Sequence, residues 1–223
     1  AMAREPGVLV RRGSDEVQSL DPHKVSTVED VRVASELFEG LTRYRADGSI
    51  EPGLAESWTV SADGLLWRFT LREALRFSDG SPLTAQDVAA SFRRLMTPAT
   101  AAPNATLFQA IEGAAEVAAG KAPPERLAVT APDARTVEIR LARPFPAFAE
   151  LLAHAAASVL PSRLIAEHGD AWVRQRPLIG SGPFRLKEWR LHSALRLERN
   201  PHYHDADRVR LAGVAYRPVQ DDQ

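Results

Sequence analysis

The chain has 223 residues, of which 44% are hydrophobic and 26% are charged, and its formal net charge is -1. This is the ordinary balance of a soluble globular protein with one large or two small domains. A net charge so close to zero provides no overall field that would recruit nucleic acid or an anionic membrane. The absence of cysteine excludes a disulfide scaffold, a thiolate metal site and a cysteine nucleophile.

The length of the apolar runs and the first residues of the chain also constrain the class of protein. No apolar run approaches the ~20 residues that a membrane span requires, and no signal peptide is visible before the first strand-like run. Ala1 in front of Met2 resembles the remnant of a tag, so we expect that a secretion signal has been removed.

The first third of the chain predicts one strand, one helix and one hairpin. Residues 8–10 are typical of a short buried strand. Thr27 is a helix N-cap with Asp30 three residues on, a variant of the capping box. The apolar positions of this helix follow at helical spacing: Ala34, Leu37, Phe38 and Leu41. Segments 56–61 and 65–72 form a hairpin around Asp63-Gly64, with Trp67, Phe69 and Leu71 on the buried face.

Strands and helices continue to alternate in the rest of the chain. Thr84 and Asp87 cap a helix that carries Val88, Phe92 and Leu95 on one side. A helix is expected over 105–119, ending at Gly120, and a second hairpin over 127–130 and 136–141. A shorter helix begins at Pro146, Ser162 caps another that ends near Gly169, and strands are expected at 183–189, 194–198 and 214–217. This mixed order predicts an α/β or α+β fold.

Two histidines have the best spacing for a metal site. In a strand, the imidazoles of His202 and His204 would face the same side, as a zinc or copper pair requires. Two ligands rarely complete a site, so we expect no metal here. The isolated histidines His23, His154 and others are expected to be capping, surface or core residues.

No segment assembles an active site. Gly180-Ser181-Gly182 resembles half of a phosphate-binding loop, but Pro183 and a strand follow it, so no helix N-terminus is offered to a phosphate. A glycosidase would need two carboxylates held ~5–10 Å apart in a cleft. The acidic residues of this chain are better explained as helix caps and turns, and we predict that the protein is not an enzyme.

Motifs spread over almost the whole chain point to one family. They are EVQSLDPHK at 16–24, LFEGL at 37–41, PGLAESW at 52–58, FTLR at 69–72, FSDG at 77–80, LTAQDV at 83–88, SGPF at 181–184 and NPHY at 200–203. In order and spacing they resemble the oligopeptide-binding branch of the bacterial extracytoplasmic solute-binding proteins, the receptors of peptide ABC importers. Ser181 replaces a threonine of the family pattern, and His204 replaces an aromatic residue.

The resemblance implies a two-lobed clamp of mixed α/β fold. Members of the family run further than this chain, so we expect an N-terminal fragment that lacks the second lobe. Residues 1–38 and 162–223 resemble the discontinuous first-lobe domain, and residues 39–161 resemble an accessory domain inserted into it.

The resemblance also implies where a ligand would lie. In relatives an extended peptide bonds through its backbone to both lobes, as in strand addition. The stretch Val25, Ser26, Thr27 and Val28 matches the first-lobe strand that pairs with the ligand. Asn104 falls where relatives often place a tyrosine against the ligand, which leaves the preference for peptides open. No cofactor is expected.

The expected partners follow from the same family. They are an oligopeptide or another small solute and the permease subunits of an ABC transporter, with no nucleic acid and only peripheral contact with a membrane. The expected location is periplasmic or extracellular. Other members bind nickel chelates, haem, opines or oligosaccharides, and some transcription regulators carry such a domain as a ligand sensor. These alternatives remain open at this point, although neutral charge and the absence of a helix-turn-helix before Val8 count against a regulator.

Overall fold

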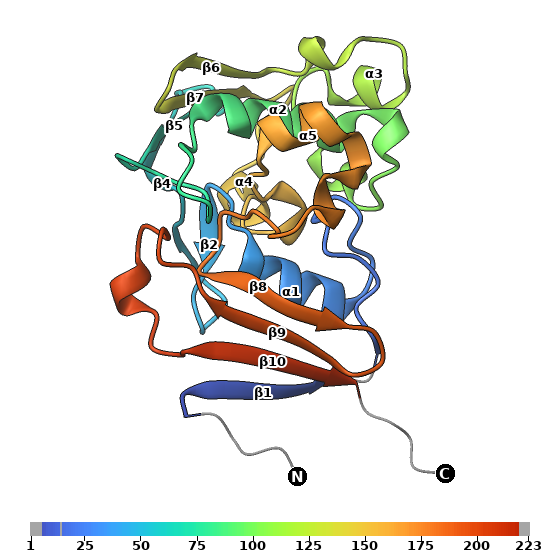
Figure 1. The fold of residues 1–223 in the computed structure, drawn as a ribbon. Helices are drawn as coiled ribbons and strands as arrows, with labels where there is room; N and C mark the ends of the chain where they lie inside the picture. The colour runs from blue at the N-terminus through green and yellow to red at the C-terminus, as the bar shows by residue number, and fades with distance from the viewer. Residues whose placement is uncertain (1–5, 14, 219–223) are drawn as a thin grey trace.

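The computed structural model describes residues 6–13 and 15–218, so Ala1 and Met2 lie outside the described residues. Two four-stranded sheets organise these residues into a lower and an upper part (Figure 1). The mixed α/β fold predicted from the sequence is confirmed.

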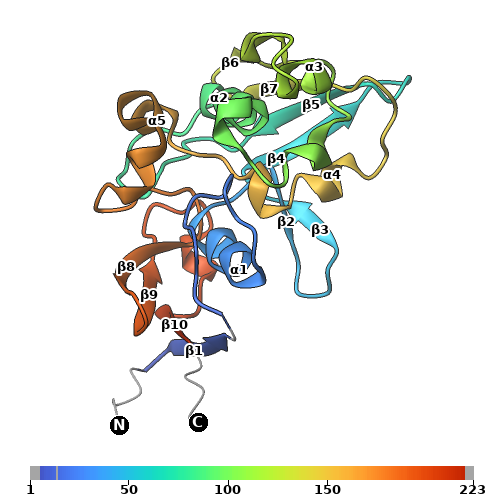
Figure 2. The same ribbon diagram turned by 90° about the vertical axis from the view of Figure 1, so that its right-hand side faces the viewer.

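The lower part contains a sheet that joins the two ends of the chain. Its strands are β1 (Val8–Gly13), β8 (Phe184–Arg190), β9 (Ala194–Arg199) and β10 (Gly213–Pro218), in the order β1-β10-β9-β8. β1 pairs with β10 in parallel, and the other neighbours are antiparallel. Helix α1 (Val28–Leu37) lies on one face of this sheet (Figures 1 and 2).

The upper part contains an antiparallel sheet covered by a helix. β4 (Ala55–Val60), β5 (Leu66–Leu71), β6 (Val129–Asp133) and β7 (Thr136–Arg140) take the order β4-β5-β7-β6. Helix α2 (Ala85–Met96) buries its apolar face against them. Both hairpins expected in this region are confirmed.

Shorter elements connect the two parts. A small hairpin of β2 (Thr42–Tyr44) and β3 (Ile50–Pro52), which the sequence did not predict, lies beside α1 (Figure 2). The remaining helices are α3 (Ala114–Ala118), α4 (Phe148–Leu151) and α5 (Ser162–His168), with 3-10 turns η1 (Pro98–Thr100), η2 (Ala105–Phe108), η3 (Pro124–Arg126), η4 (Ala155–Ala157), η5 (Gly169–Arg174) and η6 (Ala206–Arg208).

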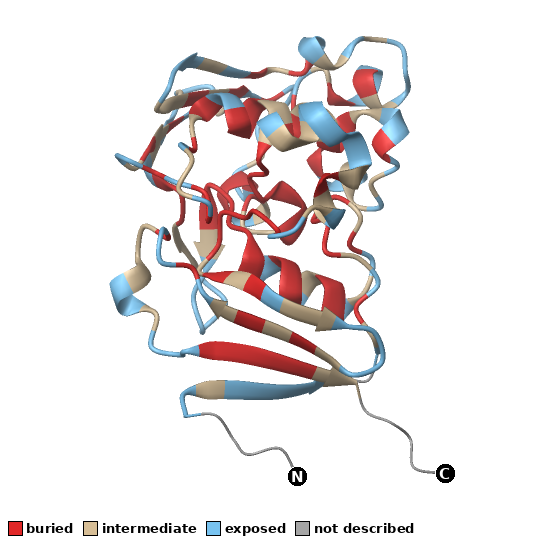
Figure 3. Ribbon diagram, viewed as in Figure 1, coloured by how far each residue is buried: buried red, intermediate tan, exposed pale blue. Residues whose placement is uncertain are grey.

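Each part has its own hydrophobic core (Figure 3). The lower core includes Phe38 and Leu160, and the upper core begins at Leu41 and runs to Val159, with Ile179 added. The change from one core to the other therefore falls close to both predicted domain boundaries. These cores support the division into 1–38 with 162–223 and 39–161, which stays a prediction.

The prediction of one continuous helix over 105–119 is wrong, because the chain leaves the helical conformation in the middle of this range. The chain forms η2 and α3 instead, and between them Ile111 makes a β-bridge with Leu141. Gly113 has a φ of 85°, and a Cβ at this position would lie 2.4 Å from the carbonyl oxygen of Arg126. A continuous helix would require the right-handed conformation here, so tertiary contacts interrupt it.

Two predicted helix ends also differ. α1 ends at Leu37, and Phe38 is already extended, so the apolar spacing through Leu41 continues past the helix. α5 begins at Ser162 with Pro161 in the cap position. The Ser162 hydroxyl donates to the Asp87 carboxylate at 2.5 Å and thereby joins α5 to the start of α2.

A buried ion pair connects the two parts. Arg94 near the end of α2 donates from Nη1 and Nη2 to the Asp21 carboxylate at 3.2 and 2.7 Å. Asp21 also accepts from the indole of Trp172 at 3.2 Å and from the backbone N–H of His23 at 3.0 Å. The side chain of Asp21 is 2% exposed and that of Arg94 is 10% exposed, so the buried Asp21 carboxylate depends on Arg94 for its charge partner.

His23 lies inside the same cluster as a neutral imidazole. Its Nδ1 is 2.7 Å from Nη1 of Arg94. Because a guanidinium only donates, Nδ1 accepts and the proton resides on Nε2. Burial, opposed by Asp21 and assisted by Arg94, lowers the pKa of His23 to about 3.

Removing one partner of the ion pair should be costly. Asp21→Asn is expected to lower the free energy of unfolding in urea by about 3 kcal/mol, because Arg94 stays buried with Asp170 as its remaining charge partner. Glu73→Gln is the control, since Glu73 and its partner Arg135 are 83% and 41% exposed. Equal losses in the two variants would contradict the importance of the buried pair.

The neutral His23 predicts a loss of stability in acid. Between about pH 6.5 and pH 3 the unfolded chain protonates His23 while the folded chain does not. The contribution of His23 is therefore complete above pH 6.5 and declines as the pH falls, by at most about 1.4 kcal/mol per pH unit. Urea unfolding between pH 6.5 and 4.5 measures this slope. His23→Asn should flatten it and His168→Asn, at the surface, should not; an unchanged slope in His23→Asn would exclude this origin.

Candidate functional site

The carboxylate of Asp30 organises the loop that precedes α1. Its Oδ1 accepts from the backbone N–H groups of Gln18 and Ser19 at 2.7 and 3.3 Å. Its Oδ2 accepts from those of Ser26 and Thr27 at 3.2 and 3.4 Å. The Thr27 hydroxyl accepts from the Asp30 N–H at 3.1 Å and completes the predicted capping box. The buried side chain of Asp30 thus holds the loop backbone at two places, residues 18–19 and residues 26–27.

The ligand-pairing strand expected at residues 25–28 is not a strand. Val25, Ser26 and Thr27 lie in the capping loop, and Val28 is the first residue of α1. The strand prediction is wrong because Asp30 draws the backbone N–H groups of Ser26 and Thr27 into the helix cap. Val25 is buried, whereas Ser26 and Val28 are exposed.

Two main-chain groups of this loop nevertheless remain open to a ligand. Within the described residues, the Ser26 carbonyl and the Val28 N–H have no hydrogen-bond partner. Thr27 between them is extended, with φ -111° and ψ 164°. An extended residue points the preceding carbonyl and the following N–H to the same side, as in one bridge of a parallel ladder. We refer to Ser26 C=O and Val28 N–H as the open edge.

Asn104 reaches this loop from the upper part. Its Nδ2 donates to the Val25 carbonyl at 3.1 Å, across 79 residues of sequence. The structure therefore brings together Asn104 and Val25, two residues that the sequence assigned to one site. Contact of these residues with a ligand remains a prediction.

His154 is a neighbouring polar residue that sequence reasoning treated as isolated. Its Nδ1 accepts from the Ala156 N–H at 3.0 Å, and burial lowers its pKa. The adjacent Ala155 packs with Val25 and Ala34 in a small apolar cluster. His154 thus caps a turn whose next residue contacts the capping loop, a position that no spacing in the sequence indicates.

The two histidines with metal-like spacing point to different partners. The ring of His202 packs near Gly80, whereas Nε2 of His204 lies 2.6 Å from the Glu39 carboxylate. The hydroxyl of Tyr203 donates to the same carboxylate. The side chains of His204 and Glu39 are nearly buried, so this hydrogen-bonding contact joins the loop before β10 to the end of α1.

Arg43 extends this polar cluster to the β2–β3 hairpin. It donates to Glu51 at 2.8 Å, to Asp205 at 3.1 Å and to the Tyr203 hydroxyl at 2.5 Å. The hydrogen bond from Arg43 lowers the pKa of Glu51. A hollow of about 230 Å³ lies between this hairpin and α1. The charged side chains of the cluster are paired with one another. The cluster therefore joins the β2–β3 hairpin to the loop before β10.

The glycine-rich turn at 180–182 is a structural junction. The Ser181 hydroxyl accepts from the Glu39 N–H at 3.0 Å and donates to the Val159 carbonyl at 2.8 Å. A Cβ on Gly182 would lie 2.6 Å from the backbone of α1, so only glycine fits. Through Glu39 and Val159 the turn contacts both segments in which the chain passes from one part to the other. It does not form a phosphate-binding loop.

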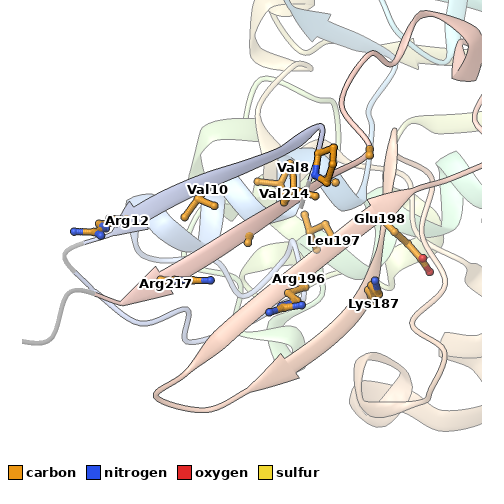
Figure 4. Close-up of a pocket in the computed structure, with 13 residues that line it drawn as sticks. Val8, Val10, Arg12, Lys187, Arg196, Leu197, Glu198, Val214 and Arg217 are labelled. Atoms are coloured by element: carbon orange, nitrogen blue, oxygen red, sulfur yellow. The ribbon is translucent and has the colours of Figure 1, made fainter. Parts of the chain in front are cut away.

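A larger hollow, of about 740 Å³, lies on the face of the lower sheet away from α1 (Figure 4). Val8 and Val10 of β1 line it beside the small residues Gly213 and Ala215 of β10. Cationic side chains also line it: Arg12, Lys187, Arg196 and Arg217. None of the residues predicted for the ligand site belongs to this hollow.

No helix within 6–13 and 15–218 has the length and apolar character needed to cross a bilayer.

The Asp30 carboxylate should be required for the shape of the open edge. Asp30→Ala removes four accepted hydrogen bonds, of which the one from the Thr27 N–H is half of the capping box, and we expect a loss of about 3 kcal/mol in the free energy of unfolding. Amide hydrogen exchange should accelerate at Gln18, Ser19 and Ser26 in particular. Asp207→Ala, at an exposed site, is the control. Protected amides at these positions in Asp30→Ala would contradict the assignment.

Comparison with known proteins places this chain in a family. The family model for bacterial extracellular solute-binding proteins, family 5, middle region, matches residues 49–223. The periplasmic oligopeptide-binding protein OppA of Salmonella typhimurium is 39% identical over 216 residues, which cover 96% of this chain and 40% of the relative. YgiS of Escherichia coli, named a probable deoxycholate-binding periplasmic protein, is 38% identical over 200 residues, covering 89% of this chain and 37% of the relative.

Solved structures agree with these sequences. The crystal structure of Haemophilus influenzae OppA in complex with the peptide RPPGFSPFR has a TM-score of 0.93 and 33% identity, covering 97% of this chain and 42% of that one. The chain thus spans about 40% of the length of the curated relatives that it matches. With a family model matching more than half of its residues, the chain belongs to the bacterial extracellular solute-binding proteins of family 5.

Proposed function

We propose that this chain contributes one half of a peptide-binding clamp in the receptor of an ABC importer. The supporting observation is the open edge: one carbonyl and one N–H that point to the same side across the extended Thr27. The name of the Salmonella typhimurium relative, and the peptide in the Haemophilus influenzae complex, favour an oligopeptide as the ligand.

The open edge suits one residue of an extended peptide. The ligand residue would donate its N–H to the Ser26 carbonyl and accept from the Val28 N–H, as in a parallel β-bridge. Such bonding involves only backbone atoms, so it selects for an extended main chain and leaves side chains free to vary. Recognition by one edge supplies few hydrogen bonds, each of about 0.5–1.5 kcal/mol net. A second lobe would supply the others and exclude water.

The wider assignment follows from the same proposal. Residues 1–38 with 162–223 would form the first-lobe domain, and 39–161 the accessory domain. The receptor would act in the periplasm or outside the cell and deliver its ligand to permease subunits at the membrane. No catalytic step is part of this role.

A second ligand class has a specific observation in its favour. YgiS, with a deoxycholate-binding name, is about as similar to this chain as OppA is. A steroid carboxylate has no peptide backbone and could not form the bridge at the open edge. The two ligand classes are therefore separated by the dependence of binding on the Val28 N–H.

Val28→Pro tests the open edge. Proline at the first position of a helix is favourable, and the extended Thr27 before it is compatible with proline, so α1 should remain intact. The substitution deletes the N–H, and we expect a threefold to tenfold loss of affinity for trialanine. Chemical-shift titration of the isotope-labelled chain at millimolar peptide measures this loss.

Val28→Ala, which keeps the N–H, is the matched control and should bind like the unmodified chain. In the titration, shift changes should gather at Ser26, Thr27 and Val28. Shift changes confined to other residues would contradict the open edge. Micromolar or tighter binding of trialanine by these 223 residues would contradict the need for a second lobe.

A further inference from the structure

The loop that carries the open edge is held by Asp30 of α1 and also by side-chain contacts with the upper part. Besides the pair between Arg94 and Asp21, Nζ of Lys24 donates to the Thr100 carbonyl at 2.6 Å. In Figure 1 this loop, in blue, lies beside the green segment that follows α2. The last contact in the series is that of Asn104 with the loop.

Asn104 binds the loop in a single orientation. The Val25 carbonyl can only accept a hydrogen bond, so the amide of Asn104 must direct its nitrogen, and not its oxygen, towards it. Asn104 is half-buried, and Val25 is fully buried. One N–H of the Asn104 amide is therefore committed to the loop.

One peptide unit is consequently held at both ends. The unit between Val25 and Ser26 has its carbonyl bound by Asn104 and its N–H bound by Asp30 at 3.2 Å. A trans peptide is planar, and its carbonyl and N–H point in opposite directions. Two fixed partners on opposite sides therefore define the plane of this unit.

The orientation of this plane carries over to the open edge. In the next peptide unit the Thr27 N–H points to Asp30, so the Ser26 carbonyl, on the opposite side of the same plane, points away from the cap. Ser26 joins the two units, so rotation of the first plane would change the direction from which Ser26 enters the second. The clamp on the Val25–Ser26 unit, together with the bond from the Thr27 N–H to Asp30, thus holds the direction of the ligand-facing carbonyl.

We infer that Asn104 is a positioning residue for the ligand: it acts from the upper part, through the Val25 carbonyl, to aim the Ser26 carbonyl at the ligand backbone. This inference rests on the proposed function, because it assumes that the open edge meets the ligand. It assigns to the segment after α2 a part in binding that does not require direct contact with the ligand.

Asn104→Asp provides the sharpest test. The carboxylate has the same shape but lacks the donor, and it places a negative oxygen against the Val25 carbonyl. We expect faster amide exchange at Ser26 and about a tenfold loss of trialanine affinity in the shift titration. Asn104→Gln keeps an amide donor, so its affinity for trialanine should be higher than that of Asn104→Asp. Gln109→Glu is the matched control, because this nearby amide is exposed and has no hydrogen-bond partner among the described residues.

The measurements separate this inference from the function on which it rests. Loss of affinity in Asn104→Asp, with the urea unfolding midpoint close to that of Gln109→Glu, supports the positioning role. If Val28→Pro weakens binding and Asn104→Asp does not, the positioning role is overturned while the open edge stands. If neither substitution weakens binding, the open edge fails and the inference fails with it.

Discussion

The buried pair of Asp21 and Arg94 is the contact on which the arrangement of the two parts depends. Both side chains are nearly buried, so each charge is balanced by its partner in place of water, and separation of the parts would break the pair. The Trp172 indole and the neutral ring of His23 complete the cluster. Domains with separate cores usually move relative to each other. Here the ion pair of Asp21 and Arg94 between the lower and upper parts opposes such motion.

In the proposed function, the ligand backbone would meet a helix cap and not a sheet. The helix cap binds the backbone N–H groups of Ser26 and Thr27. Within the described residues the Ser26 carbonyl and the Val28 N–H stay unpaired, and these two groups form the open edge. An edge of this kind is short and cannot slip in register, because the cap fixes it at one residue. It is also less prone to pair with other chains than a long exposed strand would be.

Local patterns in the sequence predicted local structure well. The caps at Thr27 and Thr84 and the alternation through Trp67 depend on neighbours within a few residues, and the structure confirms them. The site was predicted less completely. The contact of Asn104 with Val25 spans 79 residues, and only the fold decides which distant donor reaches a given carbonyl. Family resemblance indicated both residues, but it suggested a strand where the cap lies.

The parallel pairing of β1 with β10 has a consequence for the order of events during synthesis. Val8 pairs with Gly213, so the first strand has no partner until about 200 further residues have left the ribosome. At about 5–20 residues per second this delay lasts on the order of 10–40 s. During that time an apolar strand is open to wrong partners. Arg11 and Arg12 within β1 place charge where the nascent chain would otherwise aggregate.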